Sequence, residues 1–485
     1  MKLYILTEGF AFTGYGHVAR CLAIAKSFRN LGIEVTFIVN GDENVRSQLH
    51  DFPLIASDWP REYPALQRHL SVADFLLVDS YLAPKNVYDD LAARVPMAIF
   101  IDDYNRLDYP AGIIVNGTVG AEAIPYDFKP RRLYLLGGDF VILRDAFKHL
   151  PRRSEISEEI TRVLVTFGGT DPLNVTPRVL RLLTTFFPTW EKTVVLGAAF
   201  SDVRTVESLA DSRTKLLRNL TAGEMRDAMM TCDLAISAAG QTINELAATG
   251  LPSVVFKVAG NQTYNIAGWK KYGFIDAYLD ATAEWDDSQL CDAIRSLASA
   301  DVRRRMSLRG QESMDGCGPD RLAKRVLRLF AIEQLSLRPA ADEDASRLFE
   351  LANDALVRQN SFSTKTIAWD EHRAWFARLL ADEGRRLYVF FVKNEFLGQV
   401  RFDSDGWRDA VISISLASAF RGWGLASVVL QNAVAAIRHE HAALQHINAY
   451  VKPANVASRL AFEKAGFRPA ECERADSLKF IYSYA

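Results

Sequence analysis

A glycine-containing turn near residue 422 has the residues needed to hold a phosphate group. Residues 421–426 read Arg-Gly-Trp-Gly-Leu-Ala and follow an apolar run, 411–416, whose length and composition predict a strand. A helical stripe of small and apolar residues follows the turn. A strand, a glycine turn and a helix in this order aim backbone N–H groups at a pyrophosphate, and Gly422 and Gly424 permit its close approach. Alone, the pattern also fits a plain strand-to-helix turn.

A second segment, which begins at Asn455, favours a phosphate-binding turn over a plain strand-to-helix turn at 421–426. It begins after a predicted strand at 446–451, where Asn455 opens a helix, and it continues through Ser458 and Phe462. In this order and spacing, the two segments resemble those of the GNAT N-acetyltransferase superfamily over residues 334–485. The resemblance implies that the first segment binds the pyrophosphate of coenzyme A, and that the Asn and the Ser contact its pantetheine arm.

The resemblance implies acetyl-CoA as the cosubstrate. A neutral amine would attack the acetyl carbonyl directly, and backbone amides of the strand at 412–416 would polarise that carbonyl. The cofactor-binding residues that the resemblance implies are Leu416, Arg421, Gly422, Gly424, Leu425, Ala426, Asn455 and Ser458.

One position departs from the family pattern. Many members place a tyrosine seven residues after the asparagine, where it protonates the departing CoA thiolate, and this chain has Phe462 there. A phenylalanine cannot donate a proton, so either another group such as Tyr450 serves or the thiolate leaves unassisted. The general base is open among Glu371, His372 and Asp403, each of which fits a plain surface position better.

The N-terminal third places a histidine at a predicted helix start. Residues 14–20 read Gly-Tyr-Gly-His-Val-Ala-Arg directly after the first predicted strand, 2–7. At a helix N-terminus the positive end of the dipole disfavours an imidazolium, so His17 can accept a proton there, as a general base must. A capping or packing histidine is an equally good interpretation of this segment alone.

The middle of the chain adds two further glycine turns and a carboxylate. Residues 167–172 read Phe-Gly-Gly-Thr-Asp-Pro after a predicted strand, the form of a phosphate loop. Residues 236–252 read as strand, glycine turn, helix, glycine C-cap and proline. Glu245 lies one turn into that helix, where it can accept hydrogen bonds from ribose hydroxyls, although a surface glutamate is the alternative. Asn261 and Gln262 follow the next strand and can reach a sugar or a phosphate.

These segments together resemble the GT-B fold of nucleotide-sugar enzymes over residues 1–330. That fold includes the bacterial lipid II-forming N-acetylglucosaminyltransferase, and the closer match is to the UDP-sugar hydrolases of pseudaminic acid synthesis. The shared segments are the histidine motif, 78–81 (Val-Asp-Ser-Tyr), 143–147 (Leu-Arg-Asp-Ala-Phe), the 167–172 loop and the Asn-Gln pair. One departure is Gly260, where an acidic residue is expected before Asn-Gln.

The resemblance also implies residue roles in this region. In the hydrolase family the histidine activates water, the N-terminal half binds the sugar, and the C-terminal half binds UDP. The catalytic residue is then His17. The substrate-binding residues that the resemblance implies are Gly16, Arg20, Tyr81, Gly169, Gly240, Glu245, Asn261 and Gln262.

Strands and helices alternate through the first two thirds of the chain, which predicts parallel sheets covered by helices. The predicted strands are 2–7, 34–39, 75–79, 97–101, 162–167, 193–196, 234–237 and 253–256. A helix at 320–330 then leads to a new first strand at 335–339. We predict an α/β chain with two Rossmann-like domains in a GT-B arrangement, 1–155 and 156–332, followed by an α+β GNAT domain, 333–485.

Composition and charge exclude several other classes. With 485 residues the chain is too long for one core, and a net charge of −2 gives no strong field for nucleic acid or an anionic membrane. No apolar run reaches membrane-spanning length, and residues 1–8 read as a strand rather than a secretory leader. The five cysteines lack metal-ligand spacing, and we see no carboxylate cluster of the Mg²⁺ type. We expect reduced thiols, no metal, no membrane insertion and a cytoplasmic location.

Resemblance to both enzyme classes on one chain implies two consecutive reactions. The chain would acetylate a UDP-4-amino-4,6-dideoxy sugar and then hydrolyse the UDP-2,4-diacetamido-2,4,6-trideoxy-L-altrose product, with inversion, to UDP and free sugar. Two alternatives stay open. The first is a UDP-sugar glycosyltransferase, because the same fold accepts a sugar hydroxyl in place of water. The second is a C-terminal module that senses acetyl-CoA or modifies a protein.

Overall fold

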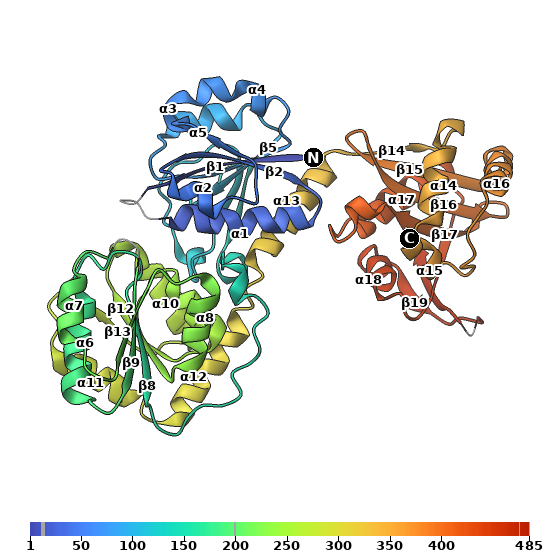
Figure 1. Cartoon of the computed structure of the whole chain (residues 1–485). Coiled ribbons are helices and arrows are strands. Elements are labelled where there is room, and N and C mark those ends of the chain that lie inside the picture. The colour runs from blue at the N-terminus through green and yellow to red at the C-terminus, as the bar shows by residue number, and fades with distance from the viewer. Residues whose placement is uncertain (11–14, 198–199, 475, 485) are drawn as a thin grey trace. The chain divides into compact units, whose positions relative to one another are not determined.

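The computed structural model describes residues 1–10, 15–197, 200–474 and 476–484. The chain forms two compact units, Met1–Ala323 and Lys324–Ala485, whose elements are labelled in Figure 1. The division falls inside helix α13 (Gly318–Glu333). The finer domain limits that the sequence suggested stay predictions. None of the helices in the described ranges combines the length and the apolar composition that crossing a lipid bilayer requires.

The first sheet of the N-terminal unit is parallel throughout. Its strands are β1 (Lys2–Gly9), β2 (Glu34–Gly41), β3 (Leu54–Ala56), β4 (Phe75–Asp79), β5 (Met97–Ile101), β6 (Gly112–Asn116) and β7 (Arg132–Leu136), in the order β3-β2-β1-β4-β5-β6-β7. Its helices are α1 (Gly16–Asn30), α2 (Asn44–Gln48), α3 (Trp59–Glu62), α4 (Gln67–Leu70) and α5 (Lys85–Ala92). Strands β4 and β5 are buried at every position, as expected for a parallel sheet covered on both faces.

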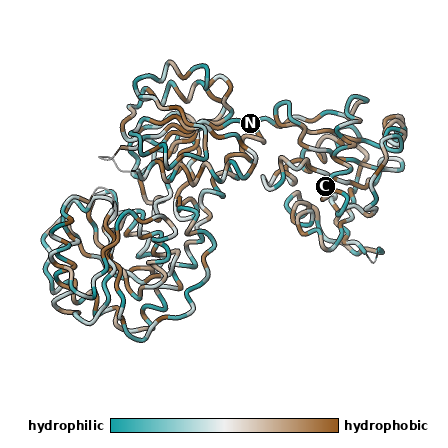
Figure 2. The backbone as a smooth tube through the Cα atoms, viewed as in Figure 1, coloured by the Kyte–Doolittle hydropathy of each residue, from teal (hydrophilic) through white to brown (hydrophobic). Residues whose placement is uncertain are grey.

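The second sheet of this unit is also parallel. Its strands are β8 (Arg162–Thr166), β9 (Glu191–Leu196), β10 (Thr214–Arg218), β11 (Leu234–Ala238), β12 (Ser253–Lys257) and β13 (Tyr278–Asp280), in the order β10-β9-β8-β11-β12-β13. Its helices are α6 (Val175–Phe186), α7 (Val203–Leu209), α8 (Ala222–Thr231), α9 (Thr242–Thr249), α10 (Thr263–Tyr272), α11 (Asp287–Ser296) and α12 (Ala300–Ser313). Figure 2 shows the hydrophobic residues concentrated on the strands and the hydrophilic ones on the outer turns.

The strand order reverses once in each of these sheets. The reversal lies between β1 and β4 in the first sheet and between β8 and β11 in the second. In open α/β sheets, ligands bind outside the carboxyl ends of the strands at such a reversal. After these four strands come His17, in the first turn of α1, and Tyr81, Gly169 and Gly240, in loops. The topology therefore points the predicted residues of both halves to the positions where ligands bind.

The C-terminal unit contains a mixed sheet in the order β14-β15-β16-β17-β18-β20-β19. Its strands are β14 (Leu335–Pro339), β15 (Arg385–Val392), β16 (Glu395–Ser404), β17 (Asp409–Leu416), β18 (His446–Val451), β19 (Arg468–Ala470) and β20 (Leu478–Ser483). Its helices are α14 (Ala345–Asn353), α15 (Ala355–Asn360), α16 (Trp369–Ala381), α17 (Ala426–Glu440) and α18 (Val456–Lys464).

The two central parallel strands of this sheet separate partway along their length. The pairing of β17 with β18 ends at Ile412 and Ala449. In the described part of the chain, residues 413–416 therefore run on without a partner from β18, although they stay paired with β16 on their other side. The predicted glycine turn follows this strand end, and α17 begins at Ala426 immediately after it.

Candidate active sites

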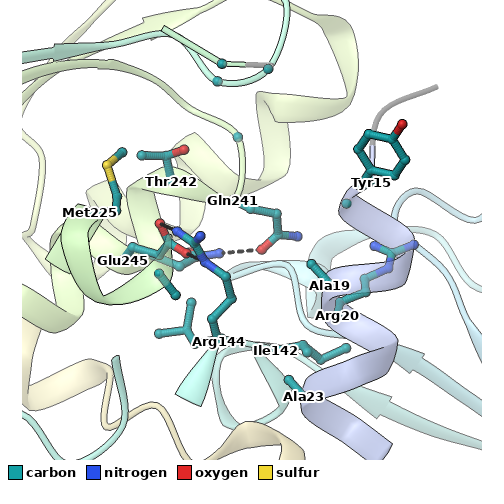
Figure 3. A pocket seen from close by; sticks show the side chains of 18 of the residues that line it. Tyr15, Ala19, Arg20, Ala23, Ile142, Arg144, Met225, Gln241, Thr242 and Glu245 are labelled. Carbon is teal, nitrogen blue, oxygen red and sulfur yellow. Dashed lines mark hydrogen bonds and ion pairs between the residues drawn. The ribbon is translucent and has the colours of Figure 1, made fainter. Parts of the chain in front are cut away.

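A cleft of about 1220 Å³ in the N-terminal unit is lined by loops and helix starts that follow strands of both sheets. All the residues predicted for catalysis and UDP-sugar binding line it: Gly16, His17, Arg20, Tyr81, Gly169, Gly240, Glu245, Asn261 and Gln262. Figure 3 shows part of this lining, with Arg20 and Glu245 on helices of different halves. The fold thus brings together residues that are far apart in the sequence, while their roles stay predictions.

His17 lies near the start of α1, beside a buried carboxylate. Its Nδ1 lies 3.6 Å from Oε1 of Glu8, at the end of β1. Glu8 also accepts hydrogen bonds from the Ser80 hydroxyl and, at 2.7 Å, from the Tyr81 N–H. Burial raises the pKa of the Glu8 carboxyl, but hydrogen bonds from these three neighbours outweigh it and lower the pKa below its ordinary value. An ionised Glu8 on the Nδ1 side favours the tautomer with its proton on Nδ1, in which Nε2 is the acceptor.

Arg20 is held by two aspartates on the same side of the cleft. Its Nε and Nη2 each donate to Asp79 at 2.5 Å, and its Nη1 donates to both oxygens of Asp103 at 2.8 and 3.0 Å. The Tyr81 hydroxyl also donates to Asp103. The Tyr81 ring meets the His17 ring edge-on, with 4.6 Å between centroids. Arg20 therefore orders the wall around the histidine, and its predicted contact with substrate stays a prediction.

Asp103 is the carboxylate of this wall that borders the cleft. Burial raises its pKa, but the charge and hydrogen bonds of Arg20 and the Tyr81 hydroxyl lower it below its ordinary value. Glu8 and Asp103 thus place two ionised carboxylates near His17. Such charges favour positive charge that develops on the imidazole or on a sugar ring nearby.

The Glu245 carboxylate, predicted to bind ribose, is paired with Arg144. The Arg144 Nε and Nη2 donate to its two oxygens at 2.8 and 2.9 Å (Figure 3). Burial raises the pKa of Glu245 above its ordinary value, and Arg144 offsets only part of this effect. A ribose hydroxyl would therefore share these oxygens with a guanidinium that already orients them.

Replacing Arg144 with methionine should destabilise the protein more near pH 7 than near pH 5. The change leaves a buried carboxylate without its partner, which costs on the order of 1–3 kcal/mol. Because the pKa of Glu245 is already raised and rises further without Arg144, the orphaned carboxyl takes up a proton as the pH falls. A carboxyl with a raised folded pKa contributes stability at low pH and loses it as the pH rises. Urea unfolding of wild type and variant at both pH values measures the difference.

Arg295→Met is the matched control for this change. Arg295 pairs with Asp292 at 2.9 Å, and both side chains are exposed. Exposed pairs contribute little, so the control should lose little stability at either pH. A loss in Arg144→Met that does not change between the two pH values would contradict the assignment of a buried, ionised Glu245.

Two glycine turns of the cleft carry no overlying side chain that would exclude a phosphate. Gly168 has a φ of +82°, and a Cβ built on it or on Gly169 would meet no described atom within 4 Å. A Cβ on Gly240 would meet only Nε2 of Gln262, at 3.7 Å. The Gln262 Oε1 accepts a hydrogen bond from the Val258 N–H at 2.8 Å, so its amide nitrogen is the end near Gly240. Turns of this kind present backbone N–H groups to phosphate oxygens.

The predicted acetyl-CoA turn has two glycines in the left-handed region of backbone conformation. Gly422 and Gly424 have φ values of +82° and +71°, which side chains disfavour. A Cβ on Gly422 would meet no described atom within 4 Å. The open face of the turn, directly before the N-terminus of α17, therefore fits a pyrophosphate. Leu425 is buried next to it and anchors the start of the helix.

The side chain of Arg421 is engaged within the protein. Its Nε and Nη2 donate to the Leu416 carbonyl at 3.1 and 2.9 Å, and Nη2 also donates to Asp354 at 2.7 Å. The hydrogen bond from Arg421 lowers the pKa of the Asp354 carboxyl below its ordinary value. Asp354 in turn caps α15 by accepting the N–H groups of Leu356 and Val357. Arg421 thus connects the turn to α15, and its contact with pyrophosphate stays a prediction.

Asn455 caps helix α18. Its Oδ1 accepts a hydrogen bond from the Ser458 N–H at 3.1 Å, so these two predicted pantetheine contacts are fixed relative to each other. Phe462 on the same helix is buried, with its ring stacked on Phe480 and edge-on to Phe467. The position that often carries an acid is therefore part of the hydrophobic core.

The candidate bases lie in different surroundings. His372 is buried on α16, with its Nε2 3.1 Å from the Ala345 carbonyl, and burial lowers its pKa. This histidine belongs to the core, which corrects the surface position expected for it. Asp403 pairs with Arg401 at 3.0 Å, and Glu371 is exposed in the first turn of α16. Across the described residues, no group of three or more His, Cys, Asp or Glu side chains is placed to hold a metal ion.

Three side chains in or beside the cleft were not predicted from the sequence. Glu8 and Asp103 follow or end the apolar strands β1 and β5, and a carboxylate at the carboxyl end of a central strand is a usable signal. Arg144 lies inside a segment that carried the GT-B resemblance. Its partner is 101 residues away, so the pairing could not be read from either segment.

Comparison with known proteins gives a family match in the C-terminal part of the chain and curated relatives that each cover about half of it. Residues 334–468 match the acetyltransferase (GNAT) domain family. An uncharacterized protein from Methanocaldococcus jannaschii is 28% identical over 271 residues, which cover 53% of this chain and 55% of that protein. The pseudaminic acid cytidylyltransferase and UDP-2,4-diacetamido-2,4,6-trideoxy-beta-L-altropyranose hydrolase of Helicobacter pylori is 24% identical over 265 residues, which cover 54% of this chain and 45% of that protein. The chain thus spans about half the length of these relatives.

A solved structure supports the fold of the N-terminal unit. The MurG structure from Acinetobacter baumannii is similar with a TM-score of 0.51 at 14% identity, covering 68% of this chain and all of MurG. A likeness at this identity concerns the fold alone. Together with the two parallel sheets and the mixed C-terminal sheet, it confirms the predicted fold class. The chain therefore joins an N-terminal α/β unit with the GT-B fold to a C-terminal domain that matches the acetyltransferase (GNAT) family.

Proposed function

We propose that the chain is a bifunctional nucleotide-sugar enzyme of pseudaminic acid synthesis. Its C-terminal domain acetylates the amine of a UDP-4-amino-4,6-dideoxy sugar, and its N-terminal unit hydrolyses UDP-2,4-diacetamido-2,4,6-trideoxy-L-altrose to UDP and free sugar. The observation that carries the proposal is the pairing of His17 with the ionised Glu8 in a cleft with two open glycine turns. The name of the Helicobacter pylori relative and the GNAT match support it.

In the hydrolytic step, Nε2 of His17 accepts a proton from water while the water oxygen bonds to the anomeric carbon. The bond from that carbon to the diphosphate oxygen breaks, and UDP leaves with the electron pair on the opposite face, which inverts the configuration. Glu8 stabilises the imidazolium that forms. Backbone N–H groups around Gly169 and Gly240 stabilise the charge on the leaving diphosphate, and donors of this kind are worth about 3 kcal/mol each.

In the acetyltransferase step, acetyl-CoA supplies the activated acetyl group that the uncharged sugar amine attacks. Backbone amides within 413–416, beyond the end of the β17–β18 pairing, would polarise the carbonyl. Because Phe462 is buried and has no proton to give, the thiolate leaves without help from that position. The proton that the amine loses goes to solvent.

Mass spectrometry of products tests the two activities together. The protein is incubated with UDP-4-amino-4,6-dideoxy sugars, with and without acetyl-CoA. We expect the nucleotide sugar to gain one acetyl group, followed by UDP and the free diacetamido sugar, only when acetyl-CoA is present. UDP release that requires an added sugar acceptor would show a glycosyltransferase instead. Acetyl-CoA binding without transfer to any of these sugars would favour a sensing or protein-modifying module.

A further inference from the structure

The helix that leads into the C-terminal domain brings an arginine to the glycine turn. Arg328 lies on α13, in the compact unit Lys324–Ala485 and ahead of residue 334, where the family match begins. A Cβ built on Gly424 would lie 3.8 Å from Cδ and 3.9 Å from Nη1 of Arg328. The guanidinium therefore borders the same turn that fits a pyrophosphate.

One nitrogen of this guanidinium lacks a partner within the described residues. The Arg328 Nε is buried without a hydrogen-bond acceptor there. The indole Nε1 of Trp423, which stands between the two turn glycines, is likewise buried without an acceptor among those residues. An unpaired buried donor costs about 1–3 kcal/mol. The Arg328 donor beside the glycine turn indicates an acceptor that the described protein atoms do not supply.

Arg421, at the same glycine turn, is an arginine whose guanidinium is bound by protein groups. Its guanidinium is taken up by the Leu416 carbonyl and the Asp354 carboxylate. Arg328 has the same charge and borders the same turn, yet its Nε has no such partner. Arginine presents a planar set of N–H donors that matches the oxygens of a phosphate. The open space over Gly422 leaves room for that phosphate.

We infer that Arg328 binds a phosphate group of acetyl-CoA at this turn, an inference that rests on the proposed acetyltransferase function. The acetyl-CoA site then includes a residue from a helix outside the matched GNAT domain. The pyrophosphate and the ribose 3′-phosphate of the cosubstrate offer the same chemistry, and acetyl-CoA and 3′-dephospho-acetyl-CoA distinguish them.

Isothermal titration of the full chain tests the inference. Arg328→Ala should weaken the binding of acetyl-CoA by about 10- to 100-fold, the range for hydrogen bonds to a charged group. Arg328→Lys should recover part of this loss, because it keeps the charge and loses the planar fork. Arg325→Ala is the matched control, since Arg325 is an exposed arginine on the same helix, and its affinity should equal that of wild type.

Thermal unfolding separates binding from a structural role. Without acetyl-CoA, Arg328→Ala should unfold at the wild-type temperature or above it, because the change removes an unpaired buried donor. With acetyl-CoA, its Tm should rise less than that of wild type. A lower Tm in the absence of acetyl-CoA, with an unchanged ligand-induced rise, would assign Arg328 to the fold and overturn the inference.

The two ligands decide which phosphate is bound. An equal loss of affinity for acetyl-CoA and for 3′-dephospho-acetyl-CoA assigns Arg328 to the pyrophosphate, and a loss for acetyl-CoA alone assigns it to the 3′-phosphate. Unchanged affinity of Arg328→Ala for both, in a chain whose wild type binds acetyl-CoA, overturns the inference and leaves the proposed function standing. A wild-type chain that binds neither ligand overturns the proposed acetyltransferase function itself.

Discussion

Replacing His17 with alanine is expected to lower UDP release by about 10²- to 10⁴-fold, the usual contribution of a positioned general base. Acetyl transfer should continue at the wild-type rate, because His17 and the predicted acetyl-CoA turn at 421–426 belong to different compact units. UDP release from the diacetamido nucleotide sugar and release of the CoA thiol from acetyl-CoA measure the two activities on one preparation. Near-normal UDP release by this variant would remove His17 from the mechanism.

Two further substitutions sharpen this result. Glu8→Gln keeps the shape beside the imidazole but removes the charge that stabilises its protonated form, so UDP release should fall less than in His17→Ala and acetyl transfer should not change. His50→Ala is the control, because His50 is an exposed histidine that pairs with Asp51 on the surface, and both activities should stay at the wild-type level.

Replacing Gly422 with valine should lower acetyl transfer and leave UDP release unchanged, the opposite of the result expected for His17→Ala. The residue has a φ of +82° and open space where a Cβ would stand, so the new side chain occupies the place predicted for phosphate oxygens. We expect kcat/KM for acetyl-CoA to fall on the order of 10²-fold, since displaced phosphate contacts misplace the thioester. UDP release from substrate that already carries both acetamido groups should not change.

Gly406→Val separates this effect from backbone strain. Gly406 lies between β16 and β17, has a φ of +76°, and would also meet no described atom within 4 Å of a Cβ. Both substitutions place a side chain in a left-handed conformation, at a cost of roughly 1–2 kcal/mol. Equal losses of acetyl transfer in the two variants would mean that strain, rather than a phosphate site, explains the first.

Sequence patterns predicted the parallel sheets because their central strands are buried on both faces. The runs at 75–79 and 97–101 coincide with β4 and β5, and the run at 34–39 lies inside β2. Short or edge strands such as β3, β7 and β13 were not predicted. Their residues are largely half-buried or exposed, so they lack the continuous apolar run on which the prediction depended.

The parts of the candidate sites that were predicted are those formed by residues of a single short segment. The glycine turns and the histidine at a helix start are local features, and the fold places each at a strand end or a helix start. Pairings across the fold were not predicted. The ion pair of Arg144 with Glu245 joins residues 101 positions apart, and that of Arg421 with Asp354 joins residues 67 positions apart. A single sequence does not record which distant charges meet.

The ion pair between Arg421 and Asp354 connects the glycine turn at 421–426 to a very short helix. Helix α15 has only six residues, far fewer than a helix needs to persist alone in water. Its Asp354 cap is held in turn by the Arg421 guanidinium. If α15 frays, Arg421 loses its ion pair with Asp354 and keeps the Leu416 carbonyl as its acceptor. If the turn binds acetyl-CoA as proposed, the relevant free energy is that of this local fraying rather than that of global unfolding.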